Sequence, residues 1–419
     1  EEKMIKEDIY NKINKIKQMK LTINMERGWP SKEQLELSLP MLDMVTSKTN
    51  LLREVDYRGY AGTGGILPLK RLFADMLSTD IENVYIGGTM STTIMYDIIE
   101  KMCSLGKDGN PPWNELEDIK FICPSPGYEK HFKICKRFNI TMLPVPMNQD
   151  GPDMDIVEKM VIDDCSIKGI WCVPLYSNPT GIVYSDEVVR RLANMQTAAR
   201  DFIIMWDNAY CVHHLTKRRY TILNILDECT KAGQKDRVFE FTSTSKITFP
   251  GAGVGVCASS VDNIKWLEHN SLLQLKTGDK INQLRHYLFL QNMDVVHRHM
   301  EKHAAIIKPK FDLIDKKLRC ELREIKGIKW NNPKGGYFMH IELLPNMAKA
   351  VWMKCKEFGV SITPAGSTYP YGIDPQDSTI RLAPTYLSLK EISVAMDVFC
   401  CVVKLVYLKN KTGGSYSEC

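Results

Sequence analysis

Three short polar segments of the chain each come directly after an apolar run. They are Tyr176-Ser177-Asn178-Pro179-Thr180-Gly181 after residues 169–175, Asp207-Asn208-Ala209-Tyr210 at the end of 202–207, and Ser243-Thr244-Ser245-Lys246 after 238–242. Taken singly, each has an ordinary interpretation as a turn, a helix cap or a solvated loop. Taken together, they supply an amide, an acid, a phenol and an amine, which suit a site built around one flat heteroaromatic ring.

The elements that must position these segments alternate along the chain. Apolar runs predict strands, and amphipathic runs between them predict helices. The predicted strands are 83–86, 119–123, 169–175, 202–207, 238–242 and 254–258, and the helices are 92–104, 128–138, 185–200 and 224–232. Such alternation is typical of an α/β fold with a mostly parallel sheet covered by helices, and ligands bind there at the carboxyl ends of the strands.

The order of elements changes from Pro309 onward. A helix over 309–325, strands at 327–330, 337–341 and 380–382, and helices over 348–358 and 388–408 predict a small α+β domain. The first fifty or so residues contain a helix and a loop but no series of strands. We therefore predict three parts, which are an N-terminal segment 1–55 packed on the small domain, a large domain 56–308 and a small C-terminal domain 309–419.

The combined motifs resemble fold-type I enzymes that depend on pyridoxal 5'-phosphate. Within that group, the chain is most similar to an aspartate aminotransferase branch whose members also carry alanine-glyoxylate names. The likeness extends from Arg27-Gly28 to Thr385 and includes the segments 279–286 and 363–366. The resemblance implies a large domain with a sheet of the seven-stranded type, a small α+β domain and transfer of an amino group from an L-amino acid to a 2-oxo acid.

The resemblance also implies roles around the cofactor ring. Lys246 would form the Schiff base with pyridoxal phosphate and then move a proton, because an amine of lowered pKa can act as nucleophile and base. Asp207 would pair with the ring nitrogen, Asn178 and Tyr210 would hydrogen-bond the phenolic oxygen, and Tyr128 would stack on the ring.

Phosphate binding is predicted at Gly88-Thr89-Met90-Ser91, which follows one strand and opens a helix, so that backbone N–H groups face an anion. Ser243 and Ser245 can add hydroxyls. Tyr60 matches a tyrosine that the neighbouring subunit contributes in relatives, which implies a homodimer with active sites at the interface. Many aminotransferases carry a phosphate-binding arginine shortly after the lysine, but residues 249–255 contain none.

Substrate binding is predicted from the same resemblance. Arg381 would hold the α-carboxylate bidentately, and Gly28 would approach the substrate with its backbone. Aspartate or glutamate is the expected donor. The distal carboxylate of such a donor would be bound by Lys280 or Arg285, reaching in from the partner subunit. Alternatively, these two residues form ion pairs at the subunit interface. Trp29 stands where a polar residue is expected, so its ring either changes specificity or only packs.

Composition limits the other possibilities. The net charge of +5 over 419 residues, without a basic block, does not favour nucleic acid as a partner. No apolar run of roughly 18 residues predicts a membrane span. The thirteen cysteines form no CxxC pair, so no metal site is predicted, and scattered thiols favour a cytoplasmic protein. A pyridoxal-phosphate-dependent lyase or decarboxylase remains an alternative, and a cofactor-binding regulator a remote one.

Overall fold

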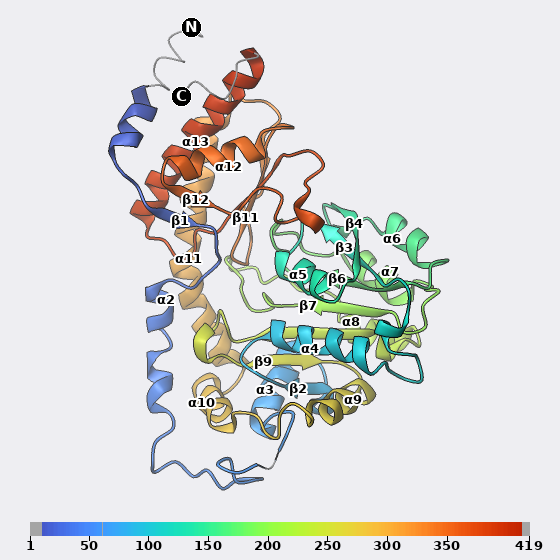
Figure 1. Ribbon diagram of the computed structural model, residues 1–419. Helices are drawn as coiled ribbons and strands as arrows, with labels where there is room; N and C mark the ends of the chain where they lie inside the picture. Colours follow the sequence, from blue (N-terminus) through green and yellow to red (C-terminus); the bar gives the residue numbers. More distant parts are fainter. Residues whose placement is uncertain (1–10, 61, 413–419) are drawn as a thin grey trace.

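A mostly parallel sheet forms the centre of the molecule. The computed structural model describes residues 11–60 and 62–412. Within them, eight strands lie in the order β2-β9-β8-β7-β6-β3-β4-β5 (Figure 1). Their bounds are β2 (Val84–Ile86), β3 (Lys120–Ser125), β4 (Thr141–Asn148), β5 (Gly151–Pro152), β6 (Ile167–Cys172), β7 (Ile203–Asp207), β8 (Val238–Ser243) and β9 (Gly255–Ala258). The predicted α/β class is confirmed, and β5 adds a two-residue strand to the seven-stranded type.

Pairing in this sheet changes direction only near its edges. The pairs from β8 through β7, β6 and β3 to β4 are parallel, whereas β2–β9, β9–β8 and β4–β5 are antiparallel. Every residue of β6, β7 and β8 is buried. Strands covered on both faces read as mostly apolar runs, which is why the sequence predicted these three, although β6 contains Lys168 and β8 contains Glu240.

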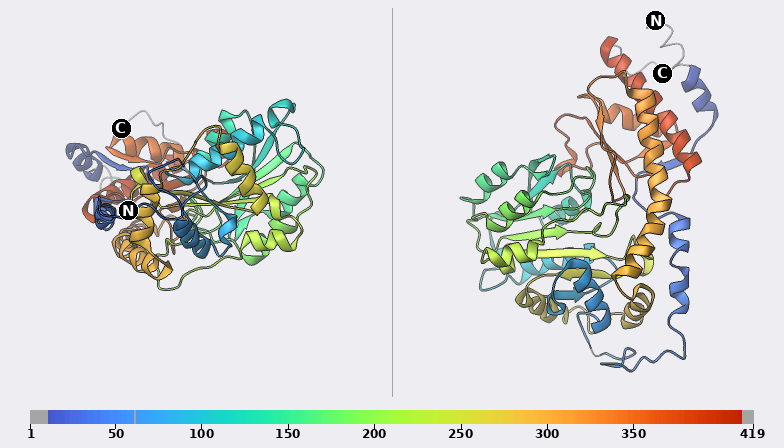
Figure 2. Two further views of the ribbon diagram at one scale, coloured as in Figure 1. Left: turned by 90° about the horizontal axis from the view of Figure 1, so that it is seen from below. Right: turned by 180° about the vertical axis from the view of Figure 1, so that it is seen from behind.

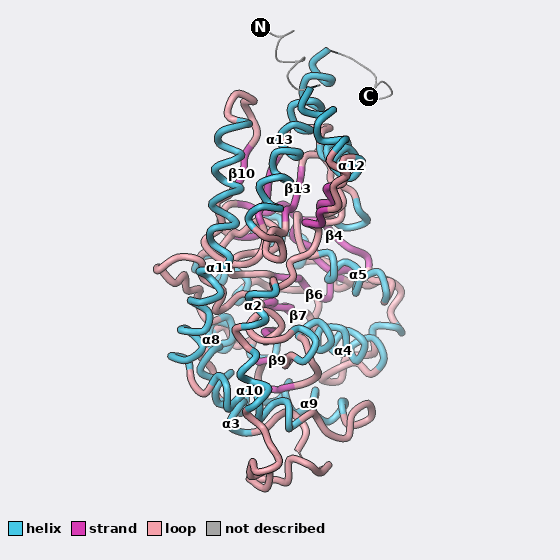
Figure 3. Tube along the Cα trace, turned by 90° about the vertical axis from the view of Figure 1, so that its left-hand side faces the viewer, coloured by secondary structure: helices cyan, strands magenta, loops and turns pink. Residues whose placement is uncertain are grey.

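Helices cover both faces of the sheet (Figure 3). One buried core gathers apolar residues of α4, α5 and α9, and another gathers those of α3, α6, α7, α8, α10 and the first part of α11. Their bounds are α3 (Leu67–Leu77), α4 (Ser91–Ser104), α5 (Glu129–Arg137), α6 (Met154–Val161), α7 (Asp186–Asn194), α8 (Ile225–Lys231), α9 (Val261–Ser271), α10 (Lys280–Leu290) and α11 (Met293–Leu322).

A second, smaller part lies beside the carboxyl edge of the large sheet. It contains the antiparallel sheet β10-β11-β13 and the parallel pair β1–β12. One further core unites these strands with α12, α13 and the second part of α11. The bounds are β1 (Ile23–Met25), β10 (Lys329–Trp330), β11 (Met339–Glu342), β12 (Val360–Ile362), β13 (Thr379–Leu382), α12 (Ala348–Glu357) and α13 (Leu389–Thr412).

The N-terminal segment lies along this smaller part and along α11 (Figure 2). It contains the helix α2 (Lys32–Glu36) and the short strand β1. The sequence predicted a helix in this segment but no strand. Ile23 and Met25 are buried in the core of the smaller part. The division of the chain at 55/56 and 308/309 stays a prediction, and its second boundary falls inside α11.

Two of the differences from the sequence expectation involve proline. Strand β4 was not predicted because Pro144 and Pro146 interrupt its apolar pattern, and proline argues against a strand that is paired on both sides. On the outer edge of β4, β5 pairs only with Met147 and Asn148. Pro144 and Pro146 therefore have no strand partner on that side, where their missing N–H groups would be needed. Helix α11 begins at Met293 rather than at Pro309, so this proline lies inside the helix instead of opening it.

The described helices are all too short or too rich in charge to cross a lipid bilayer. Strands β6, β7 and β8 end side by side at the edge of the sheet that faces the smaller part (Figure 1). The three polar segments singled out in the sequence therefore converge at this edge.

Candidate active site

A cavity of about 410 Å³ lies between the carboxyl edge of the large sheet and the smaller part. Most of the predicted site residues line it together. They are Gly28, Met90, Ser91, Tyr128, Asn178, Asp207, Tyr210, Ser243, Ser245, Lys246 and Arg381. Segments that are far apart in the sequence thus meet at one cavity, as the carboxyl-edge argument predicted.

Asp207 is the last residue of β7, and its carboxylate is buried. His131 Nε2 lies 3.0 Å from Asp207 Oδ2, and the imidazole stacks on Trp171 at 4.2 Å between ring centroids. Asp207 Oδ1 has no hydrogen-bond partner among the described residues. A buried carboxylate oxygen without a partner is costly unless a ligand donates to it.

Lys246 directs its amine between two aromatic rings. Nζ lies 5.6 Å from the ring centre of Tyr210 and 5.7 Å from that of Tyr337. Burial lowers the pKa of the Lys246 amine, and the charge of Asp207 opposes this shift only in part. A lysine with a lowered pKa has a larger neutral fraction, which is the form that attacks a carbonyl carbon or accepts a proton.

A hydrogen-bond chain supports the backbone of Lys246 from behind. The Tyr337 hydroxyl donates to the carbonyl oxygen of Lys246 at 3.4 Å and accepts from Gln34 Nε2 at 2.8 Å. His299 Nε2 lies 2.7 Å from the carbonyl oxygen of Ile247. These contacts fix the loop that carries the amine, and they come from the N-terminal segment, α11 and the turn before β11.

Arg381 lies on β13 in the wall opposite the large sheet, and its side chain is buried. Its Nη1 and Nη2 donate to Glu129 Oε2 and Oε1 at 2.7 and 3.1 Å. Nη1 also donates to Asn178 Oδ1 at 3.1 Å, and Nε donates to Thr363 Oγ1 at 3.1 Å. The guanidinium therefore faces the cavity in a fixed orientation.

The turn 87–91 and the loop after Lys246 form the far end of the cavity. Gly88 has a φ of +67°, and Gly255 donates from its backbone to the Gly88 carbonyl at 3.2 Å. A Cβ on Gly255 would lie 2.6 Å from the Met90 carbonyl oxygen, so only glycine permits this approach. Helix α4 begins at Ser91 beside it, and Ser243 Oγ donates to Ser245 Oγ at 3.1 Å. Hydroxyls and helix N–H groups thus gather where an anion can bind.

Three predicted residues lie away from the cavity of their own chain. Tyr60 is 78% exposed. The Lys280 amine donates to the Gly59 carbonyl at 2.8 Å and to Thr277, and Arg285 Nη2 donates to Asn282 Oδ1 at 2.6 Å. Gly88 and Thr89 precede the lining residues Met90 and Ser91. Roles for Tyr60, Lys280 and Arg285 across a subunit boundary stay predictions.

The sequence did not single out Glu129, His131, Tyr337 or Gln34. Glu129 and His131 closely follow the predicted site residue Tyr128 in the same helix. Their closeness to Tyr128 in the sequence was the one signal that could have identified them. The spacing of Ser31 and Gln34 is typical of a helix start, but nothing in the sequence marks a site role for Gln34 or Tyr337, because their contacts depend on long-range packing. Trp29 lines the cavity but is 52% exposed, and its ring contacts Tyr386 edge-on at 6.0 Å.

Comparison with known proteins gives a family match over almost the whole chain. The family model described as aspartate amino-transferase matches residues 3–414. The chain belongs to the aspartate aminotransferase family. It is therefore an aminotransferase that uses pyridoxal 5'-phosphate, as its motifs predicted, and its substrates are an amino acid and an oxo acid. Asp207 Oδ1, the Lys246 amine and the anion-binding end of the cavity together fit the ring, aldehyde and phosphate of this cofactor.

Several members and structures are similar to this aminotransferase over most of their length. The aspartate aminotransferase of Corynebacterium glutamicum is 40% identical over 400 residues, which cover 95% of this chain and 92% of that protein. An aminotransferase homologue of Mycolicibacterium smegmatis is 43% identical over 91% of this chain and 90% of that protein. The crystal structure of an aspartate transaminase from Corynebacterium glutamicum superposes with a TM-score of 0.94 at 38% identity, over 98% and 97% of the two chains.

Proposed function

We propose that this aminotransferase takes aspartate or glutamate as its amino donor and works as a cytoplasmic homodimer. The observation that carries the proposed chemistry is Asp207 Oδ1, which is buried without a hydrogen-bond partner among the described residues and lies in the same cavity as the Lys246 amine. The names of the two relatives from Corynebacterium glutamicum support the choice of donor.

When bound, pyridoxal phosphate supplies an aldehyde that accepts the amino group and a ring that withdraws electrons. In our proposal Asp207 keeps a proton on the ring nitrogen through Oδ1, and His131 holds Oδ2 so that Oδ1 faces the cavity. The Lys246 amine first holds the cofactor and afterwards moves the proton of the substrate Cα, for which its lowered pKa is suited.

The remaining roles concern orientation. Tyr128 packs against the ring, Tyr210 and Asn178 donate to its phenolic oxygen, and Ser91, Ser243 and Ser245 bind the phosphate with the first turn of α4. Gly28 approaches the substrate with its backbone, and Arg381 binds the α-carboxylate, since a planar guanidinium fixes both the position and the orientation of that carboxylate.

The distal carboxylate of aspartate or glutamate needs a second cation. We propose Lys280 or Arg285 of the partner subunit, with Tyr60 of the partner subunit at the phosphate. Exposed apolar side chains near the loop that carries Tyr60 and near α10 support a subunit contact in this region. Large exposed apolar side chains that lie in one region favour association. These exposed side chains are Leu52, Tyr60, Leu273, Leu275 and Ile281.

The test is a single-turnover experiment with a panel of amino acids. The cofactor changes from its aldehyde to its amine form during the first half-reaction, and its absorbance reports the rate. Aspartate and glutamate should react fastest at limiting concentration. A faster reaction of alanine or of an aromatic amino acid would show that the proposed donor is wrong while leaving the aminotransferase activity unaffected.

A further inference from the structure

The guanidinium of Arg381 already has a carboxylate bound to it. The end-on edge formed by Nη1 and Nη2 contacts both oxygens of Glu129, at 2.7 and 3.1 Å. Asn178 and Thr363 accept two further N–H groups. Four of the five donors of the side chain are therefore in use, and an incoming carboxylate cannot form a second bidentate contact with this end-on edge.

We propose that Glu129 is a specificity-determining residue that competes with the substrate carboxylate for Arg381. The proposal rests on the proposed role of Arg381 as the carboxylate-binding residue. Glu129 occupies the Nη1/Nη2 edge in the free enzyme, and a substrate binds by displacing it. Glu129 lines the same cavity as Arg381, so the exchange takes place at the site itself.

Glu129 is a charged competitor at neutral pH. Burial alone would raise the pKa of its carboxyl group, but the charge and hydrogen bonds of Arg381 outweigh burial and lower it. Exchanging one carboxylate for another on the same guanidinium yields little net free energy. A ligand must therefore obtain its affinity from further contacts, so a simple monocarboxylate binds weakly and an amino acid with a second anionic group binds well.

Lys133 is the partner available to the displaced Glu129. It lies four residues further along α5, is exposed, and lines the same cavity. Its charge already contributes to the lowered pKa of Glu129. A glutamate that precedes a lysine by four residues in a helix forms a favourable pair. Glu129 thus has two positions, one on Arg381 and one towards Lys133.

The experiment measures binding of succinate to the cofactor-loaded enzyme by titration calorimetry. Succinate carries two carboxylates and no amino group, so it binds without reacting. Glu129→Gln should lower its Kd by about tenfold to a hundredfold, the range expected when a charge-assisted contact no longer competes. An unchanged or a higher Kd would overturn the proposal, since Glu129 would then remain on Arg381 in the complex.

Lys133→Gln should act in the opposite direction and raise the Kd for succinate severalfold. In the Glu129→Gln background the same substitution should have no effect, because Lys133 acts through Glu129. Additive effects would overturn this step and show that Lys133 only attracts anions in general.

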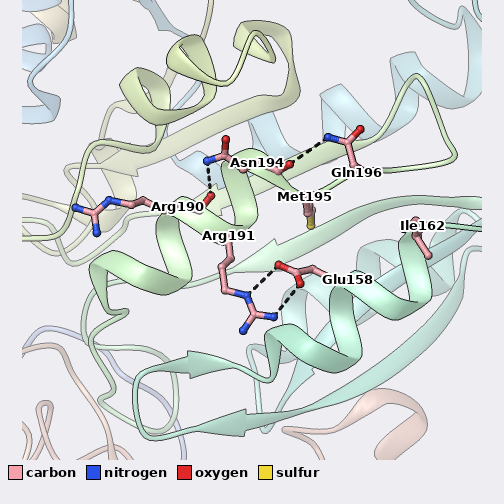
Figure 4. Close-up of a pocket in the computed structure, with 7 residues that line it drawn as sticks. All are labelled: Glu158, Ile162, Arg190, Arg191, Asn194, Met195 and Gln196. Atoms are coloured by element: carbon pink, nitrogen blue, oxygen red, sulfur yellow. Dashed lines mark hydrogen bonds and ion pairs between the residues drawn. The ribbon is translucent and has the colours of Figure 1, made fainter.

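A matched control exists between α6 and α7, remote from the cavity. Arg191 donates from Nε and Nη2 to Glu158 Oε1 and Oε2 at 2.9 and 2.8 Å, which is also a bidentate pair (Figure 4). Glu158→Gln should leave the Kd for succinate unchanged. An equal tightening in this variant would overturn the proposal by showing a general charge effect.

Two further variants separate the possible failures. Arg381→Ala should abolish succinate binding, and if it does not, the proposed role of Arg381 is wrong. If Arg381→Ala abolishes binding but Glu129→Gln does not tighten it, only the competition is wrong. Should Glu129→Gln not fold, because it leaves a buried arginine without a charged partner, Glu129→Asp keeps the charge but shortens the reach. It should tighten binding less strongly, and an unchanged Kd would count against the proposal.

Discussion

Replacing His131 with phenylalanine should weaken both the fold and cofactor binding through Asp207. His131 is buried, and its Nε2 is the partner of Asp207 Oδ2 at 3.0 Å. Phenylalanine keeps the ring that stacks on Trp171 but removes the donor. Because Asp207 Oδ1 also lacks a partner in the described structure, the variant leaves both carboxylate oxygens unpaired in a buried place.

The size of the effect follows from the loss of one hydrogen bond to a charged group. We expect the free energy of unfolding of the cofactor-free protein to fall by about 1.5–3 kcal/mol. Without His131 on Oδ2 the carboxylate can turn, so Oδ1 is less often directed at the ring nitrogen. The Kd for pyridoxal phosphate should therefore rise by roughly tenfold, which corresponds to about 1.4 kcal/mol.

Urea denaturation of the cofactor-free protein and fluorescence titration with pyridoxal phosphate measure the two quantities. His131→Gln is the matched variant, since its side-chain amide can still donate to Asp207 and should restore most of the cofactor affinity. If His131→Phe binds the cofactor as tightly as the unaltered enzyme and loses no stability, then His131 does not hold Asp207 and the assignment of Oδ1 to the ring nitrogen loses its basis.

Three further outcomes test the site, and a fourth tests the stability of the fold. Lys246→Ala should lose nearly all turnover, and borohydride reduction of the unaltered enzyme should label Lys246; a label on another lysine would contradict the assignment. Arg381→Ala should cost about 2–5 kcal/mol in kcat/KM for amino acids but less for an amine without a carboxylate, and equal losses would indicate a structural role. Tyr60→Phe subunits mixed with Lys246→Ala subunits should regain activity to the extent that Tyr60→Phe alone is impaired, because a hybrid dimer has one intact site if Tyr60 serves its partner; if Tyr60→Phe alone is impaired, no gain would show that Tyr60 does not act in the partner's site. Burial lowers the pKa of His286 from 6.5 to about 4, so the unfolded state takes up a proton first as the pH falls. The stability that this neutral histidine contributes is complete above pH 6.5 and is lost towards pH 4, by at most about 3 kcal/mol. Other buried histidines with lowered pKa values contribute in the same direction, so His286→Gln should reduce the slope of urea stability between pH 7 and 5 without abolishing it, and an unchanged slope would refute the argument.

The sequence predicted most of the large sheet, and the convergence of the polar segments at its edge, because both depend on local patterns. Buried strands such as β7 are nearly continuous apolar runs, and the polar residue that ends or follows each run must lie at the carboxyl edge. This rule is enough to bring Asp207 and Lys246 together without any knowledge of the packing.

The contacts that adjust the site could not be predicted in the same way. Glu129 and Arg381 are separated by 252 residues and by the gap between the two sheets, so no spacing rule relates them. The Gln34 contact with Tyr337 depends on how the N-terminal segment lies along the molecule. Such pairs follow from the packing of whole elements, whereas the prolines of β4 and α11 misled because local preference was overruled by tertiary contacts.

Helix α11 also bears on how this protein could be divided or recombined. It is about 45 Å long if regular, and it contributes Val296 and Met300 to one core and Phe311 and Ile314 to the other. A cut at 308/309 would leave each fragment with half a helix and an uncovered apolar surface. The two parts are therefore expected to be inherited, expressed and exchanged as a single unit, and a chimaera should join its parents outside residues 293–322.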